Sequence, residues 1–363
     1  MGFDELNKMI EDGMEGKNQS IPIGLPRLGK YANIRKDILT LIFSTTGAGK
    51  SAMIDTIIMS ACNDYMKHPY EGKLKPDFQL FSMERSKLMR LAKWLSYIVF
   101  VNEGVEIQLP KMLGWWDEKL TKEEHLLIKK YEDYLNQILN DFVTIHEGAK
   151  TPNEIYRIMK DHFEENGEYG EETIKGKKHR LYLQNNPLTV VIPIWDHGNL
   201  TKTTKDLSNK KQTIDKLVEY AQGFRDLEKA APIWVSQVNR AITGLTRAKD
   251  GEYELTLDDV KESSDIGDAC DLAISIFNPL KFGQSSKTGY NPNDFLDTSN
   301  GANYFRSAQI LKSSYGADDL RIPLAFNGFC GQFKELEKRK DLSDEQYRER
   351  VRSVLSKEFF LNN

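Results

Sequence analysis

The chain has 363 residues, a net charge of −4 at pH 7 and 39% hydrophobic residues. This length fits one large α/β domain with elaborations or two smaller domains, and the hydrophobic content is sufficient for a packed core. The slightly negative charge excludes a surface that is basic throughout. Any nucleic-acid contact would therefore come from local patches, or from loops that a ring gathers in one channel.

The cysteines and the apolar runs indicate a cytoplasmic protein. Cys62, Cys270 and Cys330 show no metal-ligand spacing, and so sparse a count is typical of a reducing compartment. The apolar runs are too short to cross a membrane. Residues 1–16 are acidic and lack a secretory signal, so we expect no membrane association.

Residues 1–20 are expected to form a linker that contains a short helix. Within residues 3–14 apolar side chains recur at helical spacing, at Phe3, Leu6, Met9, Ile10 and Met14. A polar segment with glycines follows. The pattern allows two arrangements: the helix folds back on its own core, or it docks on a neighbouring subunit.

Residues 38–53 contain a phosphate-binding loop in its required context. Residues 38–43 predict a buried strand, residues 44–51 read STTGAGKS, and an amphipathic helix follows. Ser44 stands where the general pattern has its first glycine. The alternative is a glycine turn with a surface lysine, but the agreement of strand, loop and helix favours a nucleotide site.

The chemistry of this loop explains its residue types. Gly47 and Gly49 let the backbone approach a polyphosphate where a Cβ would clash. The loop amides, from Thr46 through Ala48 to the helix start, present donors to it. Lys50 would contact the β- and γ-phosphates of ATP, and the Ser51 hydroxyl would bind Mg²⁺.

Two carboxylates follow predicted strands at the edge where α/β sheets bind ligands. Glu84 follows the strand 78–83, and Asp196 ends the strand 188–196. Asp196 matches the second nucleotide signature, a carboxylate that holds Mg²⁺ through its water shell. The alternative for Glu84 is a charge favoured by the dipole at a helix N-terminus, but the preceding phosphate loop favours a functional role.

The segments between these strands are read as helices, one strand and one insertion. Thr151 to Glu154 form a capping box with proline at the first helical position. The polar residues 164–186 are expected to be a surface insertion. The expected helices are 86–101, 118–140 and 151–163, and the expected strand is 142–148.

Two loops beyond Asp196 carry basic residues. The first, 198–212, contains Lys202, Lys205, Lys210 and Lys211, which could also be a solvated charge run. A helix at 212–230 and a strand at 232–240 follow. Within this stretch the strand ends in Ser236-Gln237, and Asn239-Arg240 follow. A glutamine at a strand end beside the nucleotide edge could detect the γ-phosphate. Arg240 and the second loop, 241–262 with Arg247 and Lys249, complete the basic set.

The last third of the chain predicts more strands and a helix. Residues 272–277 are a strand, and the polar residues 279–304 are expected to be inserted. Residues 308–314 and 321–328 are predicted as the last two strands, forming an antiparallel pair. An amphipathic helix begins near residue 343. We therefore divide the chain into 1–20, a main domain 21–335 with insertions near 164–186 and 279–304, and a C-terminal helix segment 336–363.

The order of these segments resembles the RecA-like motor domain of DnaB-type replicative helicases, over roughly residues 20–335. FSMER, ending in Glu84 and Arg85, is similar to the strand that carries the catalytic glutamate. IPIWDHGNL is similar to the Mg²⁺-binding strand, and WVSQVNR to the sensor strand. ILKSSYG followed by LAFNGFCGQF resembles the terminal hairpin with its inter-subunit finger.

The resemblance implies a RecA-like P-loop NTPase with a mostly parallel central sheet flanked by helices and a C-terminal antiparallel hairpin. It implies an ATP- and Mg²⁺-dependent helicase that threads single-stranded DNA as a hexameric ring. Catalytic roles would fall to Glu84, Gln237 and Lys312, the last reaching a neighbour's site. The basic residues of the two loops would contact DNA, and a primase or loader would be a further partner.

Three departures from the family pattern are visible. Only about 20 residues precede the core, where the family has a helical domain. The finger pattern has an arginine two residues after the lysine, and here Ser314 stands there, with Arg306 and Arg321 as alternatives. The two insertions are foreign to the compact motor. This short form suits a phage or mobile-element replication protein. Two rivals remain: a RecA- or clock-type ATPase without unwinding, and a ring-assembly component with little turnover.

Overall fold

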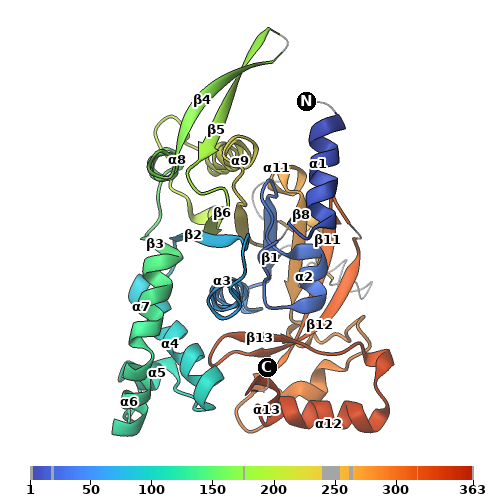
Figure 1. The fold of residues 1–363 in the computed structure, drawn as a ribbon. Coiled ribbons are helices and arrows are strands. Elements are labelled where there is room, and N and C mark those ends of the chain that lie inside the picture. Colours follow the sequence, from blue (N-terminus) through green and yellow to red (C-terminus); the bar gives the residue numbers. More distant parts are fainter. Residues whose placement is uncertain are drawn as a thin grey trace.

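The computed structural model describes residues 3–17, 20–174, 176–238, 254–260, 265–316 and 318–361. Within these residues a nine-stranded sheet has the order β13-β12-β11-β8-β1-β7-β6-β2-β3 (Figure 1). From β8 to β3 the strands are parallel, and β11, β12 and β13 extend the sheet antiparallel. The expected α/β class with a mostly parallel sheet is confirmed. The strands are β1 (Thr40–Ser44), β2 (Lys75–Ser82), β3 (Val143–Glu147), β6 (Thr189–Asp196), β7 (Ile233–Gln237), β8 (Leu272–Phe277), β11 (Phe305–Ser313), β12 (Leu320–Asn327) and β13 (Gln332–Glu335).

Helices cover both faces of the sheet, which explains why its central strands are continuous apolar runs. Successive residues of β1 alternate between the two cores: Ile42 packs on one side, and Leu41 and Phe43 on the other. The first face is covered by α2 (Pro26–Ala32), α3 (Lys50–Lys67), α4 (Lys87–Glu103) and α7 (Glu132–Asp141). The second is covered by α8 (Pro152–Glu165), α9 (Lys210–Asp226) and α11 (Asp265–Ala269).

The predicted helix 118–140 is wrong in one respect, because two helices occupy it. A short α5 (Leu109–Met112) precedes α6 (Lys122–Lys130), which is followed by α7. A capping box of Thr121 and Glu124 starts α6. The regular helix is interrupted at Tyr131. Its amide donates to the Ile128 carbonyl, and its hydroxyl donates to Glu103 of α4. The capping box predicted at Thr151 and Glu154 is present at the start of α8.

The 164–186 segment forms a two-stranded antiparallel hairpin, β4 (Gly167–Ile174) and β5 (Lys177–Gln184), which stands out from the body (Figure 1). Two tyrosines anchor its root. The Tyr169 hydroxyl donates to Glu228 at 2.8 Å, and the Tyr182 hydroxyl donates to the Phe163 carbonyl at 2.9 Å. An isolated hairpin is marginal in water, so these contacts to the body support it.

The 279–304 segment and the C-terminal helices share a third hydrophobic core, distinct from the two cores on the faces of the sheet. It contains η4 (Pro279–Phe282), η5 (Pro292–Phe295), β9 (Leu296–Asp297) and β10 (Ala302–Asn303). Its aromatic residues Tyr290, Phe295 and Tyr304 are buried with Val354 of α12 (Asp344–Leu355) and Phe360 of α13 (Glu358–Leu361). This polar-looking segment therefore contributes three large side chains to a shared core.

Two further features differ from expectation or extend it. The prediction that residues 321–328 are the last strand is wrong, because the short β13 follows a turn at Gly331 and pairs with β12. At the other end, α1 (Phe3–Met14) is the predicted helix, and its apolar stripe is exposed rather than folded back: Phe3 is 81% and Met14 83% accessible. Among the helices that the structure describes, none is long and apolar enough to span a bilayer.

Candidate nucleotide-binding site

The phosphate loop joins β1 to α3. Gly47 and Gly49 have φ angles of +80° and +106°, which side-chain-bearing residues rarely adopt. A Cβ on Gly49 would also lie 2.7 Å from the Phe333 ring. Ser44, by contrast, is the last residue of β1 and is fully buried. Because its backbone is extended strand, this position does not require glycine, which explains the departure from the general pattern.

A cavity of about 540 Å³ lies against this loop. Its walls include Gly47, Gly49, Lys50 and Ser51 from the loop and the start of α3. Glu84, two residues after β2, Gln237 at the end of β7 and His197 also line it. The carboxyl ends of parallel strands meet at one edge of the sheet. The structure therefore brings the predicted lysine, glutamate and glutamine to one cavity, which Thr46 also lines.

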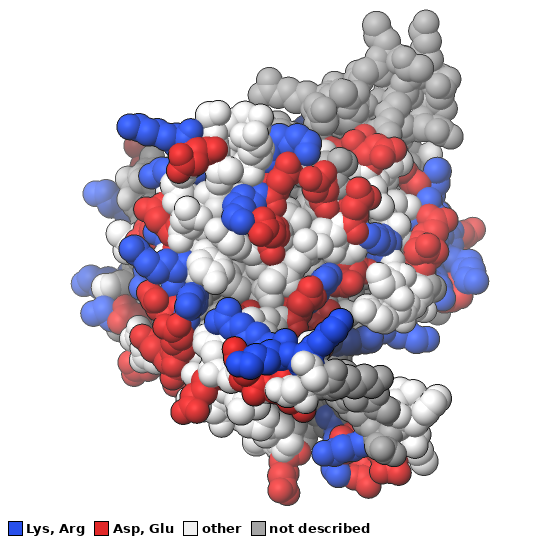
Figure 2. All heavy atoms as spheres, turned by 90° about the horizontal axis from the view of Figure 1, so that it is seen from above, with Lys and Arg blue, Asp and Glu red and all other residues white. Residues whose placement is uncertain are grey.

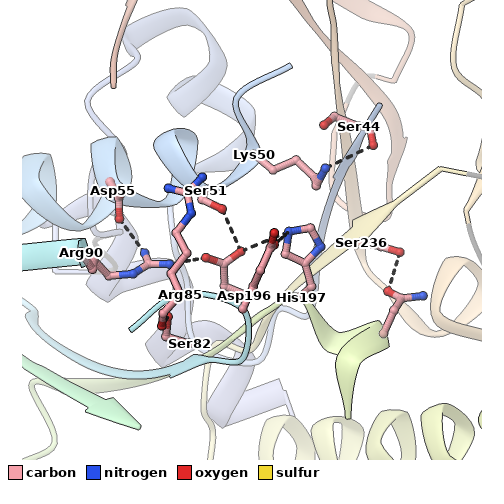
Figure 3. Close-up of polar contacts among 12 residues, drawn as sticks. Ser44, Lys50, Ser51, Asp55, Ser82, Arg85, Arg90, Asp196, His197 and Ser236 are labelled. Atoms are coloured by element: carbon pink, nitrogen blue, oxygen red, sulfur yellow. Dashed lines mark hydrogen bonds and ion pairs between the residues drawn. The ribbon is translucent and has the colours of Figure 1, made fainter. Parts of the chain in front are cut away.

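A buried chain of polar contacts connects α3, β6 and α4 (Figure 3). The Ser51 hydroxyl donates to Asp196 Oδ1 at 3.2 Å, and Arg90 donates to the other oxygen of Asp196. Arg90 also donates to Asp55 at 2.6 Å, and Trp94 Nε1 donates to the same oxygen at 2.8 Å. These bonds fix the carboxylate of Asp196 beside the hydroxyl of Ser51.

The charge of Asp196 is maintained by its neighbours. Burial by itself would raise the pKa of this carboxyl, but the Arg90 guanidinium, which also donates a hydrogen bond to it, outweighs burial and holds the pKa below its ordinary value. The group is therefore a carboxylate at neutral pH. Paired with Ser51, it offers the oxygen ligands that Mg²⁺ prefers.

Lys50 is a buried cation at the start of α3, and its ammonium lies 3.5 Å from the Ser44 carbonyl (Figure 3). Burial lowers the pKa of Lys50 to about 8, against the opposing effects of Asp196 and Glu84. A nearby polyanion would favour the charged form, so phosphate binding and protonation of Lys50 reinforce each other.

His197 is a site residue that sequence reasoning missed. It directly follows Asp196, and its Nε2 lies 2.9 Å from an oxygen of Glu84. Burial lowers the pKa of His197, although Asp196 and Glu84 act to raise it. The neutral ring can donate its Nε2–H to Glu84. The position of this histidine beside Asp196, at the end of a core strand, was the available signal.

Two cations from the C-terminal part of the chain also contact the phosphate loop. Lys281 of η4 donates to the Thr46 carbonyl at 2.7 Å, and Arg306 of β11 donates to the Ala48 carbonyl at 3.2 Å. These residues are 235 and 258 positions from their partners. A local sequence pattern cannot predict contacts between residues so far apart in the chain.

The predicted DNA-contacting lysines lie in different surroundings. Lys202 and Lys205 are exposed in the loop after η1 (Gly198–Leu200). Lys210 donates to the Thr201 carbonyl at 2.5 Å, and Lys211 pairs with Asp215 and Asp265 at 3.0 and 3.4 Å. Arg240, Arg247 and Lys249 lie outside the described residues. Seen from above, acidic and basic side chains are interspersed, and the described residues show no continuous basic field on that face (Figure 2).

Lys312 lies away from this cavity, near the amino-terminal end of β8, where it pairs with Ala273. Its ammonium donates to the carbonyls of Gly267 and Asp268 at 3.0 and 2.7 Å. Of the two alternative arginines, Arg306 is buried behind its own phosphate loop, and Arg321 pairs with Glu254 at 2.8 Å.

Two solved structures are similar to this chain in fold. The ATPase domain of a helicase matches with a TM-score of 0.68 and 16% sequence identity, over 93% of this chain and 99% of that one. A DnaB-like replicative helicase, described with its interactions with primase, matches with a TM-score of 0.66 and 15% identity, over 93% of this chain and 67% of that one. No family model and no curated protein matches the sequence. The chain therefore has the fold of helicase ATPase domains, as the order of its motifs predicted.

Proposed function

We propose that this chain is an ATP-hydrolysing motor of the helicase class that moves on single-stranded DNA. The observation that carries the proposal is the convergence on one cavity of the phosphate loop with Lys50 and Ser51, the carboxylate of Glu84 and the amide of Gln237. Asp196 lies directly behind Ser51. The fold similarity to helicase ATPase domains supports the same reading.

The residues present fit ATP and Mg²⁺. Lys50, with the amides from Thr46 to Ser51, would bind the β- and γ-phosphates, and Ser51 with Asp196 would hold the cation. A bound Mg²⁺ would neutralise the charge that develops on the transferred phosphoryl group. Glu84 would accept the proton of the attacking water, and Gln237 would contact the γ-phosphate.

His197 would hold Glu84 until nucleotide binds. A hydrogen bond from the neutral imidazole at 2.9 Å directs the carboxylate toward β6. The Glu84 side chain is 54% exposed, so it has room to turn toward a water at the γ-phosphate. In this proposal the base and its positioning residue follow the adjacent strands β2 and β6.

We propose a cytoplasmic homo-oligomer, a hexameric ring, with the loops 198–212 and 241–262 lining a central channel. Two features support a ring. The apolar stripe of α1 is exposed in the single chain. Lys312 lies near the amino-terminal ends of the parallel strands, whereas the cavity of its own chain lies at their carboxyl ends. In this proposal residues 1–20 join neighbours, 21–335 form the motor, and 336–363 form a C-terminal helical segment. A primase or loader would bind the ring, and a phage or mobile element would be its source.

A ring-assembly component with little turnover is the second candidate. It is favoured by Ser314, which stands where the family pattern has its finger arginine and whose amide bonds to the Asp271 carbonyl at 2.9 Å. A RecA- or clock-type ATPase would hydrolyse ATP without separating strands.

The deciding experiment compares the parent with Glu84→Gln in ATP hydrolysis, nucleotide binding and unwinding of a forked duplex. Loss of the general base should lower turnover by roughly 10²- to 10⁴-fold and leave nucleotide binding nearly intact. Glu147→Gln is the matched control, because Glu147 ends the neighbouring β3 but bonds to the Lys87 amide at 2.7 Å. Parent-like turnover in Glu84→Gln would refute the assigned base. Turnover without unwinding would favour the RecA-type reading, and nucleotide binding without turnover the ring component.

A further inference from the structure

Arg306 is a buried arginine that joins the phosphate loop to the C-terminal strands. It lies near the start of β11 and is only 5% exposed. Its Nε donates to the Ala48 carbonyl at 3.2 Å. Its Nη1 donates to the carbonyls of Asn303 and Phe305 at 3.0 and 2.6 Å, and to the Asn303 side-chain oxygen at 3.1 Å. Every one of these acceptors is a neutral oxygen.

The charge of Arg306 is therefore not balanced by an ion pair. Among the described residues no carboxylate pairs with it, whereas the other buried arginine, Arg90, pairs with both Asp55 and Asp196. Burial lowers the pKa of Arg306 to about 10, so the guanidinium is still a cation at neutral pH. A buried cation without a counter-charge is costly. A bound anion near the loop would offset part of this cost.

An aromatic pair fixes the guanidinium behind the loop. Its Cζ lies 4.9 Å from the centre of the Phe326 ring, which stacks on Phe333 at 4.3 Å. The same two rings leave no room for a Cβ on Gly49, which would lie 3.1 Å from Phe326. The arginine, the two rings and the glycine backbone thus form one packed unit.

The bond to Ala48 determines which way the next peptide group faces. In a planar trans peptide the carbonyl oxygen and the following N–H point in opposite directions. Because the Ala48 carbonyl is turned toward Arg306, the N–H of Gly49 is turned away from it. Gly49 lines the cavity and Arg306 does not. A hydrogen bond at the carbonyl also polarises the peptide and strengthens its N–H as a donor.

We propose that Arg306 is a positioning residue of the nucleotide site: it holds the Ala48 carbonyl away from the cavity, so that the Gly49 N–H faces the bound polyphosphate. The negative charge of the phosphates then balances the buried guanidinium. The inference rests on the proposed nucleotide site, but on neither hydrolysis nor unwinding.

The test measures dissociation constants of MgADP and MgATP by calorimetry for the parent, Arg306→Met and Arg306→Lys. Removing one charged hydrogen bond and the cation should weaken binding of both nucleotides by about 10- to 100-fold in Arg306→Met. Lysine keeps the charge but not the fork of donors, so Arg306→Lys should recover part of the affinity. Arg225→Met is the matched control: Arg225 bonds a carbonyl at 3.3 Å and Asp271 at 3.0 Å, beside the amino-terminal end of β1.

The outcomes separate the two proposals. A parent that binds neither nucleotide refutes the nucleotide site itself. A parent that binds, with unchanged constants in a folded Arg306→Met, refutes the role of Arg306. If Arg306→Met does not fold, Arg306→Lys decides: weaker binding at an unchanged melting temperature supports positioning, and parent-like binding overturns it. A loss of affinity in Arg225→Met equal to that in Arg306→Met would show a general effect of destabilisation and would also overturn it.

Discussion

Deleting residues 1–16 should weaken the proposed assembly, because α1 exposes an apolar stripe that its own core does not cover. Phe3, Leu6, Met9, Ile10 and Met14 are between 50% and 83% exposed. Together they present the equivalent of roughly three fully exposed large side chains, worth about 5 to 9 kcal/mol when buried. If ordering of the helix and its linker removes half of this, about 2.5 to 4.5 kcal/mol remains at each contact. That amount corresponds to roughly two to three orders of magnitude in the dissociation constant.

Light scattering with a parallel ATPase assay measures this effect. Truncation should lower both the assembled mass and the ATPase rate, and Leu6→Ser with Ile10→Ser should reproduce it in the full chain. Lys8→Ala with Asp12→Ala changes the opposite face and is the matched control. Lys312→Ala should lower the rate and leave the mass largely unchanged. A truncated protein of parent mass and parent turnover would refute the docking of α1 on a neighbour.

The other predictions concern single groups of the site and of the first basic loop. Since the pKa of Lys50 is lowered to about 8, nucleotide affinity should fall as pH rises through 8, and Lys50→Ala should bind weakly at every pH; a titration calorimetry series checks both. Asp196→Asn should cost about 1.5 to 3 kcal/mol in urea unfolding, because it removes one charged hydrogen bond of Arg90, which stays paired with Asp55. The folded-state pKa of Asp196 is depressed, so its contribution is present above the unfolded pKa and is lost as pH falls through the folded one; an unchanged acid transition in Asp196→Asn would contradict this. Neutralising Lys202 and Lys205 should reduce the salt slope of single-strand binding by about 0.7 for each lost phosphate contact, and an unchanged slope would place the DNA elsewhere.

The sequence was most informative where local pattern determines structure. The buried strand predicted at 38–43, the capping box at Thr151 and the glycines of the phosphate loop each follow from local sequence pattern. Glu84 and Asp196 could be placed at one edge, because the carboxyl ends of parallel strands meet there. These predictions needed no knowledge of distant contacts.

The remaining features depend on contacts between distant residues. The hairpin β4–β5 is supported by Tyr169 and Tyr182 against the body, and its charged strands give no apolar alternation. Tyr290 and Phe295 are buried by helices some 60 residues later, although their own segment is polar. Arg306 contacts the loop through a backbone carbonyl, which leaves no mark on residue types. Such contacts can be found only after the fold is known.

Strand β11 carries Arg306 near one end and Lys312 near the other, six positions apart, which is about 20 Å along a strand. Arg306 contacts this chain's own phosphate loop, and in the proposed ring Lys312 reaches the next subunit's nucleotide. Between them the backbone is bonded on both sides, to β8 and β12, so it cannot lengthen or bend freely. A small displacement at one bound phosphate would then be transmitted along the strand axis to the neighbouring nucleotide. The pairing of β11 with β8 changes register only between Ile310 and Lys312. Such a strand would couple successive active sites mechanically. The order of ATP hydrolysis around the ring would then depend on the stiffness of this strand rather than on a hinge.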